Sequence, residues 1–356
     1  MFLAQYSSVL KKVDAELRRF LEERYNELDN PFLDYFYKEV EKFLFSGGKR
    51  IRPVLMFFSS RAVNPKIDEV GIIKSSISLE LLHNASLVHD DIMDNAETRR
   101  GLSAFHKTME RYSKTKYDKS IQNPQDFGVA MGILGGDFLY NLAYNAIHVN
   151  ELPPEKVLQA SLEFNQGFFR VVRGVIIETD FMGKFTVSEK EYTEMVIGKT
   201  AALFEAAAKM GAILAGAEES QLQGLGDFAR TAGVAFQIVD DIIGTFGDPK
   251  KTGKPADSDL LEGKKTLLLI KTIEKASKSQ KDVLKRIVGN RDSTSEDIDN
   301  VRNIIVETGA LEYSRQKAEG LYHQCIEYLE SIEPSLDEKY KKFLVEVAKM
   351  GIHRQK

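Results

Sequence analysis

The nine prolines of this chain leave three long stretches in which helices can run without interruption. Residues 66–123, 155–248 and 256–333 contain no proline, a residue that breaks helix interiors because it removes a backbone hydrogen bond and clashes with the preceding turn. Apolar residues recur there near the helical period, as at Leu203, Ala207 and Met210. We interpret the β-branched run 171–177 as buried helix, because its neighbours are helical. The sequence therefore predicts an all-α fold.

Two acidic clusters lie about half the chain apart, each within an apolar run: DDIMD at residues 90–94 and DDIIG at residues 240–244. Carboxylates four residues apart on one helical face, such as Asp90 and Asp94, repel each other by roughly 0.2–0.5 kcal/mol, and burying them unpaired costs far more. Mg²⁺ would remove this cost, because it prefers oxygen ligands and is typically held by one or two carboxylates plus substrate phosphates. The alternative is a solvated acidic helix turn, but the flanking residues argue against it.

Two groups of basic residues, one before and one after the first acidic cluster, indicate phosphate binding. Arg99 and Arg100 closely follow the first acidic cluster, and arginine presents a rigid fork that matches phosphate oxygens. The segment GGKRIRP at residues 47–53 combines glycines, which let the backbone approach a ligand, with Lys49 and Arg52. Such a segment often only ends a helix, so alone it is weak evidence. Together the two basic groups predict two separate phosphate sites.

Composition argues against several other classes of protein. Lys and Arg total 49 and Asp and Glu total 53, which gives a net charge of −4, with no basic block of the kind that binds nucleic acid. The single cysteine, Cys325, allows no intramolecular disulfide and favours a reducing, cytoplasmic location. The first residues lack a signal-peptide pattern, and no apolar run approaches the length of about 18 residues expected of a transmembrane helix.

Five segments, in this order, resemble the motifs of the trans-isoprenyl diphosphate synthases. They are GGKRIRP at 47–53, LLHNASLVHDDIMD at 81–94 closed by RRG at 99–101, KT at 199–200, FQIVDD at 236–241 and KKT at 264–266. The wording LHNASL is most similar to the geranylgeranyl diphosphate synthases. The resemblance implies the isoprenoid synthase fold, a bundle of long helices around a deep central cavity. We expect one domain over residues 1–356, because both acidic clusters must meet around one substrate.

The resemblance also implies a reaction. Members of the family form homodimers and use Mg²⁺ to join isopentenyl diphosphate, head to tail, to an allylic diphosphate through a carbocation. By resemblance, Asp90 and Asp94 hold two Mg²⁺ and Asp240 a third, and Asp91 and Asp241 belong to the same metal site in supporting positions. The resemblance assigns the allylic diphosphate to Arg99, Lys199, Lys254 and Lys264. It assigns the homoallylic diphosphate to Lys49, Arg52, His83 and Arg100. Thr200 and Gln237 are expected near the cation.

Two positions depart from the family pattern. The second acidic cluster ends in Gly244 where many relatives have a third Asp, and Asp248 is a candidate to replace it. The mid-chain pattern Gly-Gln-x-x-Asp appears as GVIIE at residues 174–178, which loses an amide and lengthens the acid at Glu178. Two assigned residues also have structural alternatives: Lys199 as a helix-surface lysine and Phe236 as a core residue.

Small residues before the first acidic cluster predict a long product. Ala85 and Ser86 leave room for a growing chain where a large aromatic would stop it early, and Leu82 lies about one 5.4 Å turn further down the same helix. Phe168 and Phe169 are candidates for the cavity floor. We expect geranylgeranyl diphosphate as the product, with longer all-trans prenyl diphosphates as the alternative, and shorter products after exchange of Ala85 for Phe.

Other functions compete with this one. A terpene cyclase needs no second phosphate site, so the basic residues around Lys49 and His83 argue against it. A non-catalytic subunit of a heteromeric synthase is a further alternative, motivated by Gly244 and Val175. Outside the motifs, we expect a polar loop at residues 113–126 and a solvated outer layer of amphipathic helices from Ser293 onward.

Overall fold

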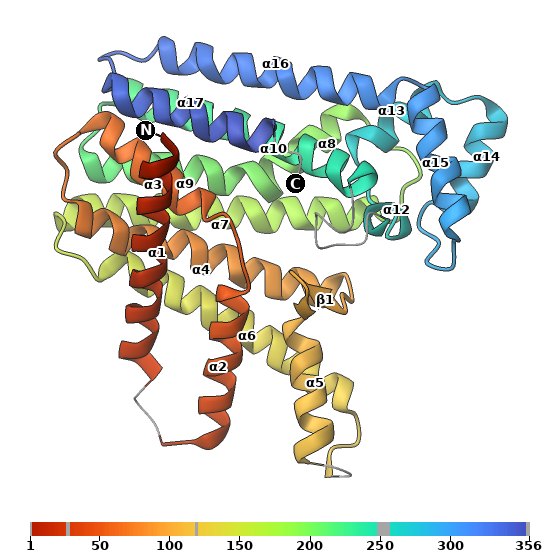
Figure 1. Ribbon diagram of the computed structural model, residues 1–356, viewed down its shortest axis with the longest axis horizontal. Coiled ribbons are helices and arrows are strands. Elements are labelled where there is room, and N and C mark those ends of the chain that lie inside the picture. Colours follow the sequence, from red (N-terminus) through yellow and green to blue (C-terminus); the bar gives the residue numbers. More distant parts are fainter. Residues whose placement is uncertain (1, 26–28, 118–119, 248–256, 354–356) are drawn as a thin grey trace.

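The computed structural model describes residues 2–25, 29–117, 120–247 and 257–353, and helices make up most of them (Figure 1). The all-α prediction is confirmed. Prolines mark where several helices begin. α2 (Pro31–Phe45) and α6 (Pro124–His148) each start at a proline that follows an asparagine, whose side chain accepts hydrogen bonds from the first backbone N–H groups. α7 (Pro154–Phe181) also starts at a proline.

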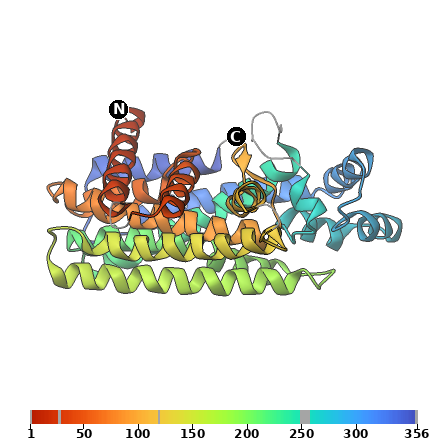
Figure 2. The same cartoon turned by 90° about the horizontal axis from the view of Figure 1, so that it is seen from below.

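Long central helices form the main core. α4 (Glu69–Met93) packs against α3 (Ile51–Val63) and α6, while α9 (Ala202–Ala215) packs against α3, α7 and α10 (Glu219–Phe246). The side chains of Ile77, Leu81 and Leu82 on α4 are fully buried, because this helix has neighbours on several faces. α7, by contrast, lies along one edge of the molecule with one face outward (Figure 2).

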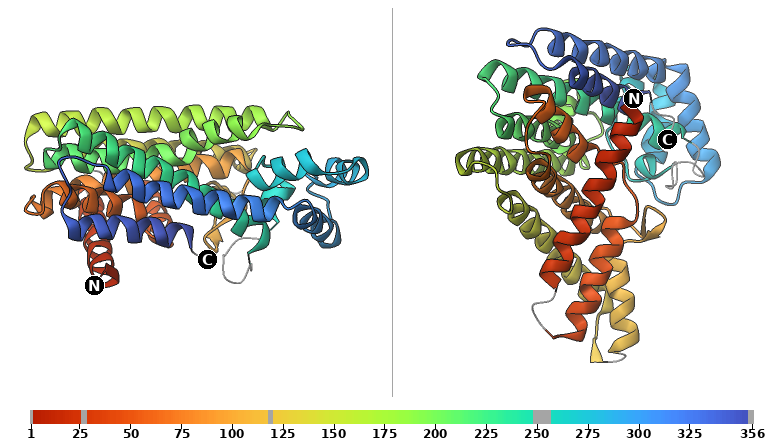
Figure 3. Two further views of the ribbon diagram at one scale, coloured as in Figure 1. Left: turned by 90° about the horizontal axis from the view of Figure 1, so that it is seen from above. Right: turned by 60° about the vertical axis from the view of Figure 1, so that its left-hand side comes forward.

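Three helices extend from one side of this core. α1 (Phe2–Tyr25), α2 and α5 (Phe105–Lys116) project together in the right-hand view of Figure 3. α1 buries Val9, Val13 and Leu17, spaced at four residues, against the rest of the molecule, in contact with α3 and α4. The N-terminal helix is therefore anchored beside the GGKRIRP segment.

A short hairpin follows α4 and was not expected from the sequence. β1 (Thr98–Arg99) pairs with β2 (Leu102–Ser103) in antiparallel register. The connecting residues Arg100 and Gly101 have φ of 52° and 77°, the left-handed backbone that two-residue hairpin turns favour. The hairpin fixes the directions of two neighbouring arginines, Arg99 and Arg100.

The second half of the chain closes the bundle. α8 (Glu189–Val196) continues through the π-helical turn η2 (Ile197–Ala201) into α9. The short helices α12 (Ser258–Leu261), α13 (Leu267–Lys275), α14 (Lys278–Ile287) and α15 (Ser295–Glu307) gather at one end (Figure 1). α16 (Ala310–Glu330) and α17 (Glu338–Ile352) then return along α10, and α17 also packs on α3.

Three expectations need correction. The predicted loop 113–126 is helical at both ends, because α5 continues to Lys116 and α6 begins at Pro124. The run 171–177 is helical, as predicted, but Val172 and Ile176 are exposed on the outer face of α7. The C-terminal helices are more than a solvated layer, since Cys325 and Leu344 are fully buried.

Among the described residues, no helix combines the length and apolar character needed to cross a bilayer.

Candidate active site

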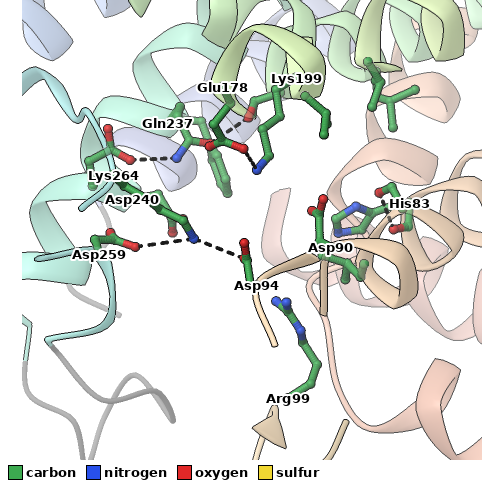
Figure 4. A pocket seen from close by; sticks show the side chains of 18 of the residues that line it. His83, Asp90, Asp94, Arg99, Glu178, Lys199, Gln237, Asp240, Asp259 and Lys264 are labelled. Atoms are coloured by element: carbon green, nitrogen blue, oxygen red, sulfur yellow. Dashed lines mark hydrogen bonds and ion pairs between the residues drawn. The ribbon is translucent and has the colours of Figure 1, made fainter. Parts of the chain in front are cut away.

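A cavity of about 620 Å³ opens between α3, α4, α7, α10 and residues 259–266, and both acidic clusters line it. Asp90 and Asp94 lie on one side and Asp240 and Asp259 on the other (Figure 4). Most residues singled out from the sequence are in its wall: Lys49, Arg52, His83, Ser86, Asp90, Asp94, Arg99, Arg100, Lys199, Thr200, Gln237, Asp240, Asp241 and Lys264. The wall does not include Leu82, Ala85 or Asp91, and Lys254 and Asp248 are outside the described residues.

Asp90 brings a carboxylate into the cavity from the last turns of α4, with no hydrogen bond or ion pair from any residue that the structure describes. Burial raises the pKa of Asp90; Lys199 opposes this effect, and Glu178 and Asp94 reinforce it. Asp94 ends the same helix, and its Oδ2 lies 3.3 Å from Nζ of Lys264. Because a partly buried carboxylate without a direct cationic partner is costly, a bound cation would stabilise this arrangement.

Asp91 does not fit the role of a metal ligand. Its side chain is fully buried outside the cavity wall, and it accepts a hydrogen bond from Nε of Arg99 at 2.8 Å. Asp91 and Asp90 diverge because successive residues of a helix point in different directions. Asp91 therefore supports the cavity by holding Arg99, the first arginine of the hairpin.

In the second cluster, Asp240 is exposed to the cavity and Asp241 is buried. Asp241 accepts hydrogen bonds of 2.7 Å from the hydroxyl of Tyr192 and from Nε2 of Gln237. Burial and the neighbouring carboxylate of Asp259 raise the pKa of Asp241 to about 8, although these two hydrogen bonds act against the shift. Tyr192 and Asp259 were missed by the sequence analysis, since neither lies in a motif that marks it.

Lys264 connects the two sides of the cavity. Its Nζ lies 2.7 Å from Glu262 Oε2, 3.3 Å from Asp94 Oδ2 and 3.9 Å from Asp259 Oδ1. Although burial opposes the shift, these three carboxylates raise the pKa of Lys264. The lysine therefore stays charged and offers a cation beside both acidic clusters (Figure 4).

Lys199 enters the cavity from the π-helical turn η2, a feature that often marks functional sites. It forms an ion pair with Glu178, the residue that departs from the family pattern. The backbones of α7 and η2 can approach each other closely because each has a glycine where they cross, Gly174 and Gly198. A β-carbon on Gly174 would lie 2.1 Å from the backbone nitrogen of Lys199. Although burial opposes the shift, Asp90 and Glu178 raise the pKa of Lys199. The surface-lysine alternative is therefore wrong.

Thr200 and Gln237 form a short hydrogen-bonded chain next to these charges. The hydroxyl of Thr200 donates to Oε1 of Gln237 at 2.7 Å, and Gln237 in turn donates to Asp241. This chain fixes the amide orientation and leaves oxygen dipoles in the cavity wall. Phe236 lines the cavity and also packs, partly buried, against the core.

Four basic residues gather at another part of the wall: Lys49, Arg52, His83 and Arg100. Burial, reinforced by Arg52 and Arg100, lowers the pKa of His83, so its ring is neutral at pH 7. Burial also lowers the pKa of Arg52 to about 10, which leaves it charged, and its guanidinium lies 5.1 Å from the ring centre of Phe204. Nε of Arg52 is buried with no hydrogen-bond partner among the described residues. This part of the cavity is suited to an anion.

Apolar side chains also line the cavity: Leu87, Val171, Val175, Leu203 and Phe204. Ser86 belongs to this wall, whereas Ala85 is buried behind it in the core. Neither candidate for the cavity floor, Phe168 or Phe169, lies in the wall. Phe169 is 58% exposed on the outside of α7, and Phe168 stacks on Tyr140 outside the cavity wall.

The donor set fits Mg²⁺. Carboxylate oxygens from both clusters face one cavity, and hard cations prefer oxygen. Within the described residues, no three acidic, histidine or cysteine side chains are grouped closely enough to hold a metal ion by themselves. Carboxylates completed by substrate phosphates, the usual environment of Mg²⁺, match this arrangement better than a closed protein cage.

Comparison with known proteins agrees with this geometry. The chain is 34% identical to the geranylgeranyl diphosphate synthase of Sulfolobus acidocaldarius over 294 residues, covering 82% of this chain and 83% of that protein. It is 33% identical to the geranylfarnesyl diphosphate synthase of Aeropyrum pernix, covering 84% and 88%. A crystal structure of geranylgeranyl pyrophosphate synthase from Corynebacterium glutamicum, complexed with isoprenyl diphosphate and magnesium, superposes with a TM-score of 0.90 at 26% identity, covering 97% and 98%.

The model of the polyprenyl synthetase family matches residues 34–305. This range contains both acidic clusters, both groups of basic residues and the helices that surround the cavity. The chain therefore belongs to the polyprenyl synthetase family.

Proposed function

We propose that this prenyltransferase condenses isopentenyl diphosphate with allylic diphosphates, head to tail, to give geranylgeranyl diphosphate. The observation that carries the proposal is that two carboxylate clusters, a separate basic group and several apolar side chains line the same cavity. The charged part suits two diphosphates, and the apolar part suits a hydrocarbon chain. The named relatives, which make geranylgeranyl and geranylfarnesyl diphosphates, support a product of this class.

Asp90, Asp94 and Asp240 would hold Mg²⁺, with three ions in the site. When bound, Mg²⁺ supplies positive charge that neutralises the diphosphate as it leaves its allylic carbon. Lys199, Arg99 and Lys264 add fixed cations for the same leaving group, and such preorganised charges stabilise the transition state most effectively in a site shielded from water. Thr200 and Gln237 direct oxygen dipoles toward the cation that remains.

Lys49, Arg52, His83 and Arg100 would bind isopentenyl diphosphate through its diphosphate group. Its double bond then attacks the allylic cation, a carbon–carbon bond forms, and the departed diphosphate accepts the proton that is lost. This second anion site supports a synthase over a terpene cyclase, which has one diphosphate substrate.

Incubation of the purified chain with farnesyl diphosphate, isopentenyl diphosphate and Mg²⁺ tests the proposal. The expected main product is geranylgeranyl diphosphate. Dominant longer products would favour the longer-chain alternative. A chain that is inactive with every allylic substrate would favour the non-catalytic subunit, the alternative motivated by Gly244 and Val175.

We further propose that the protein is a homodimer in the cytoplasm. Apolar side chains are exposed along one face of α7 and on the adjacent α6: Leu158, Leu162, Phe169, Val172 and Ile176, with Ile133 and Leu134. Exposed apolar faces of this kind typically mark protein interfaces. The cytoplasmic location is supported by Cys325, a free and buried thiol.

A further inference from the structure

A buried carboxylate lies among the basic residues of the cavity wall. Glu80 on α4 is 2% exposed, and its Oε1 accepts hydrogen bonds from Nη1 of Arg50 at 2.7 Å and from Nδ2 of Asn84 at 2.9 Å. The sequence analysis did not single out Glu80 and assigned no role to Arg50, a member of the GGKRIRP segment. An ionised carboxylate is costly to bury and is retained only where it is paired and hydrogen-bonded.

Arg50, the main partner of Glu80, is held on every side. Its guanidinium also donates to Asp14 Oδ1 at 2.9 Å and to the backbone oxygen of Leu44 at 2.8 Å, and 3% of its side chain is exposed. The backbone of Arg50 has φ of 47°, a left-handed conformation that non-glycine residues seldom adopt. Side-chain anchors of this strength can hold a residue in such a conformation.

Arg50 fixes the backbone path of the GGKRIRP segment. Lys49 and Arg52, which flank Arg50, both line the cavity, and the preceding Gly47 and Gly48 have φ of 126° and 133°. The hydroxyl of Tyr6 on α1 donates to the backbone oxygen of Lys49, so α1 holds the segment from its other side. The direction in which Lys49 and Arg52 enter the cavity therefore depends on the contacts of Arg50 and on the hydrogen bond from α1.

Glu80 is also linked to Arg100 of the hairpin, through Asn84. Asn84, which donates to Glu80, accepts from Nη1 of Arg100 at 3.4 Å. Glu80 also raises the pKa values of Arg52 and Arg100, against the larger effect of burial. One negative charge thus offsets part of the repulsion among the cations of this site before an anion enters.

We propose that Glu80 is a positioning residue for the homoallylic diphosphate, acting through Arg50 on Lys49 and Arg52 and through Asn84 on Arg100. The proposal rests on the function proposed above. It predicts that loss of the Glu80 charge weakens binding of isopentenyl diphosphate and leaves the allylic site, built around Asp90 and Lys199, unchanged.

Glu80→Gln tests this by a split between kinetic constants. The KM for isopentenyl diphosphate should rise about 10-fold, the change expected for loss of one charge-assisted hydrogen bond, while kcat and the KM for farnesyl diphosphate stay within about 2-fold. Calorimetric titration with isopentenyl diphosphate without Mg²⁺ should show the same loss of affinity. Glu205→Gln is the matched control, because Glu205 is also 2% exposed and paired with an arginine, Arg170, but lies outside the cavity wall.

The proposal is overturned if the two variants change the KM for isopentenyl diphosphate equally, if Glu80→Gln raises both substrate KM values together, or if it tightens binding. Asp14→Asn removes the partly exposed end of the Arg50 anchor and should raise the same KM about 3-fold, so the test stands even if Glu80→Gln fails to fold. An unchanged KM in Asp14→Asn would then overturn the proposal. An inactive wild-type chain would instead contradict the proposed function.

Discussion

The Asp259 carboxylate occupies the space where a side chain at Gly244 would lie: a β-carbon at position 244 would be 2.5 Å from Oδ2 of Asp259. The second acidic cluster thus lacks its third carboxylate on α10, and a carboxylate from α12 lies against that position instead. Asp259 also approaches Lys264 and raises the pKa of Asp241. The glycine is required for this approach, because any side chain at position 244 must displace Asp259.

We expect Gly244→Ala to disturb the second acidic cluster without unfolding the protein. The added methyl group moves the Asp259 carboxylate, and the gain in helix propensity offsets part of the cost in stability. The Mg²⁺ concentration for half-maximal activity should rise about 10-fold, as for other groups that support metal ligands. Gly320→Ala is the control, since a β-carbon on Gly320 meets nothing within 4 Å. Equal Mg²⁺ dependence in both variants would contradict the role given to Gly244.

Ser86→Phe should shorten the product. Ser86 is in the cavity wall one turn from Asp90, so an aromatic ring there blocks the growing chain. Ala85→Phe, which the sequence alone favoured, should instead overpack the core and cost about 1–3 kcal/mol in unfolding free energy, because Ala85 is 2% exposed and lies outside the wall. Chromatography of the products and thermal melts distinguish the two effects. Geranylgeranyl diphosphate as the main product of Ser86→Phe would contradict the assignment.

Lys199→Gln should lower kcat about 100-fold with little change in the KM for isopentenyl diphosphate, because it removes a fixed cation that acts on the leaving group. Lys209→Gln provides the comparison. Lys209 also pairs with a glutamate, Glu205, but it is outside the cavity wall. Steady-state kinetics at saturating Mg²⁺ measure the difference, and similar kcat values in the two variants would exclude a catalytic role for Lys199.

Glu189 should make stability depend on pH. Although burial opposes the shift, hydrogen bonds from Tyr313, Lys271 and Lys317 lower the pKa of Glu189 to about 2 from an ordinary value of 4.5. The ionised form is thus stabilised by folding. Its contribution, about 1–3 kcal/mol, is full above the ordinary pKa and is lost as pH falls toward 2.

Unfolding free energies of Glu189→Gln and wild type should therefore differ most at pH 6–7 and converge as pH falls below about 4. Glu151→Gln, at an exposed position before α7, serves as the control and should show no such convergence. If the difference in unfolding free energy between Glu189→Gln and wild type stays constant from pH 7 to 3, the ionised form of Glu189 does not contribute the stability.

The double variant Leu162→Glu with Ile176→Glu should dissociate the proposed dimer. Both side chains are about 60% exposed on the outer face of α7, where an added charge opposes burial in an interface. Val306→Glu, at a comparably exposed apolar position on α15, should leave the dimer intact. Sedimentation velocity reports the outcome. A wild-type chain that sediments as a monomer at all concentrations would contradict the proposal.

The sequence by itself determined the helical fold and the main charged groups of the cavity wall. Proline spacing and apolar periodicity act locally, so they located the long helices. The acidic and basic motifs stood out because charges within apolar runs require partners, and the structure places Asp90 and Asp240 in the wall of the same cavity, as expected.

The tertiary structure alone decided which motif residues face the cavity and what supports them. Asp91 and Ala85 each lie one residue from a wall residue, and the rotation of α4 turns both away. Asp259 and Glu80 carry no sequence signal, because their roles arise from contacts with Gly244 and Arg50, 15 and 30 residues away in the chain. Charge patterns identify the groups that need partners, but only the packing of helices in three dimensions selects those partners.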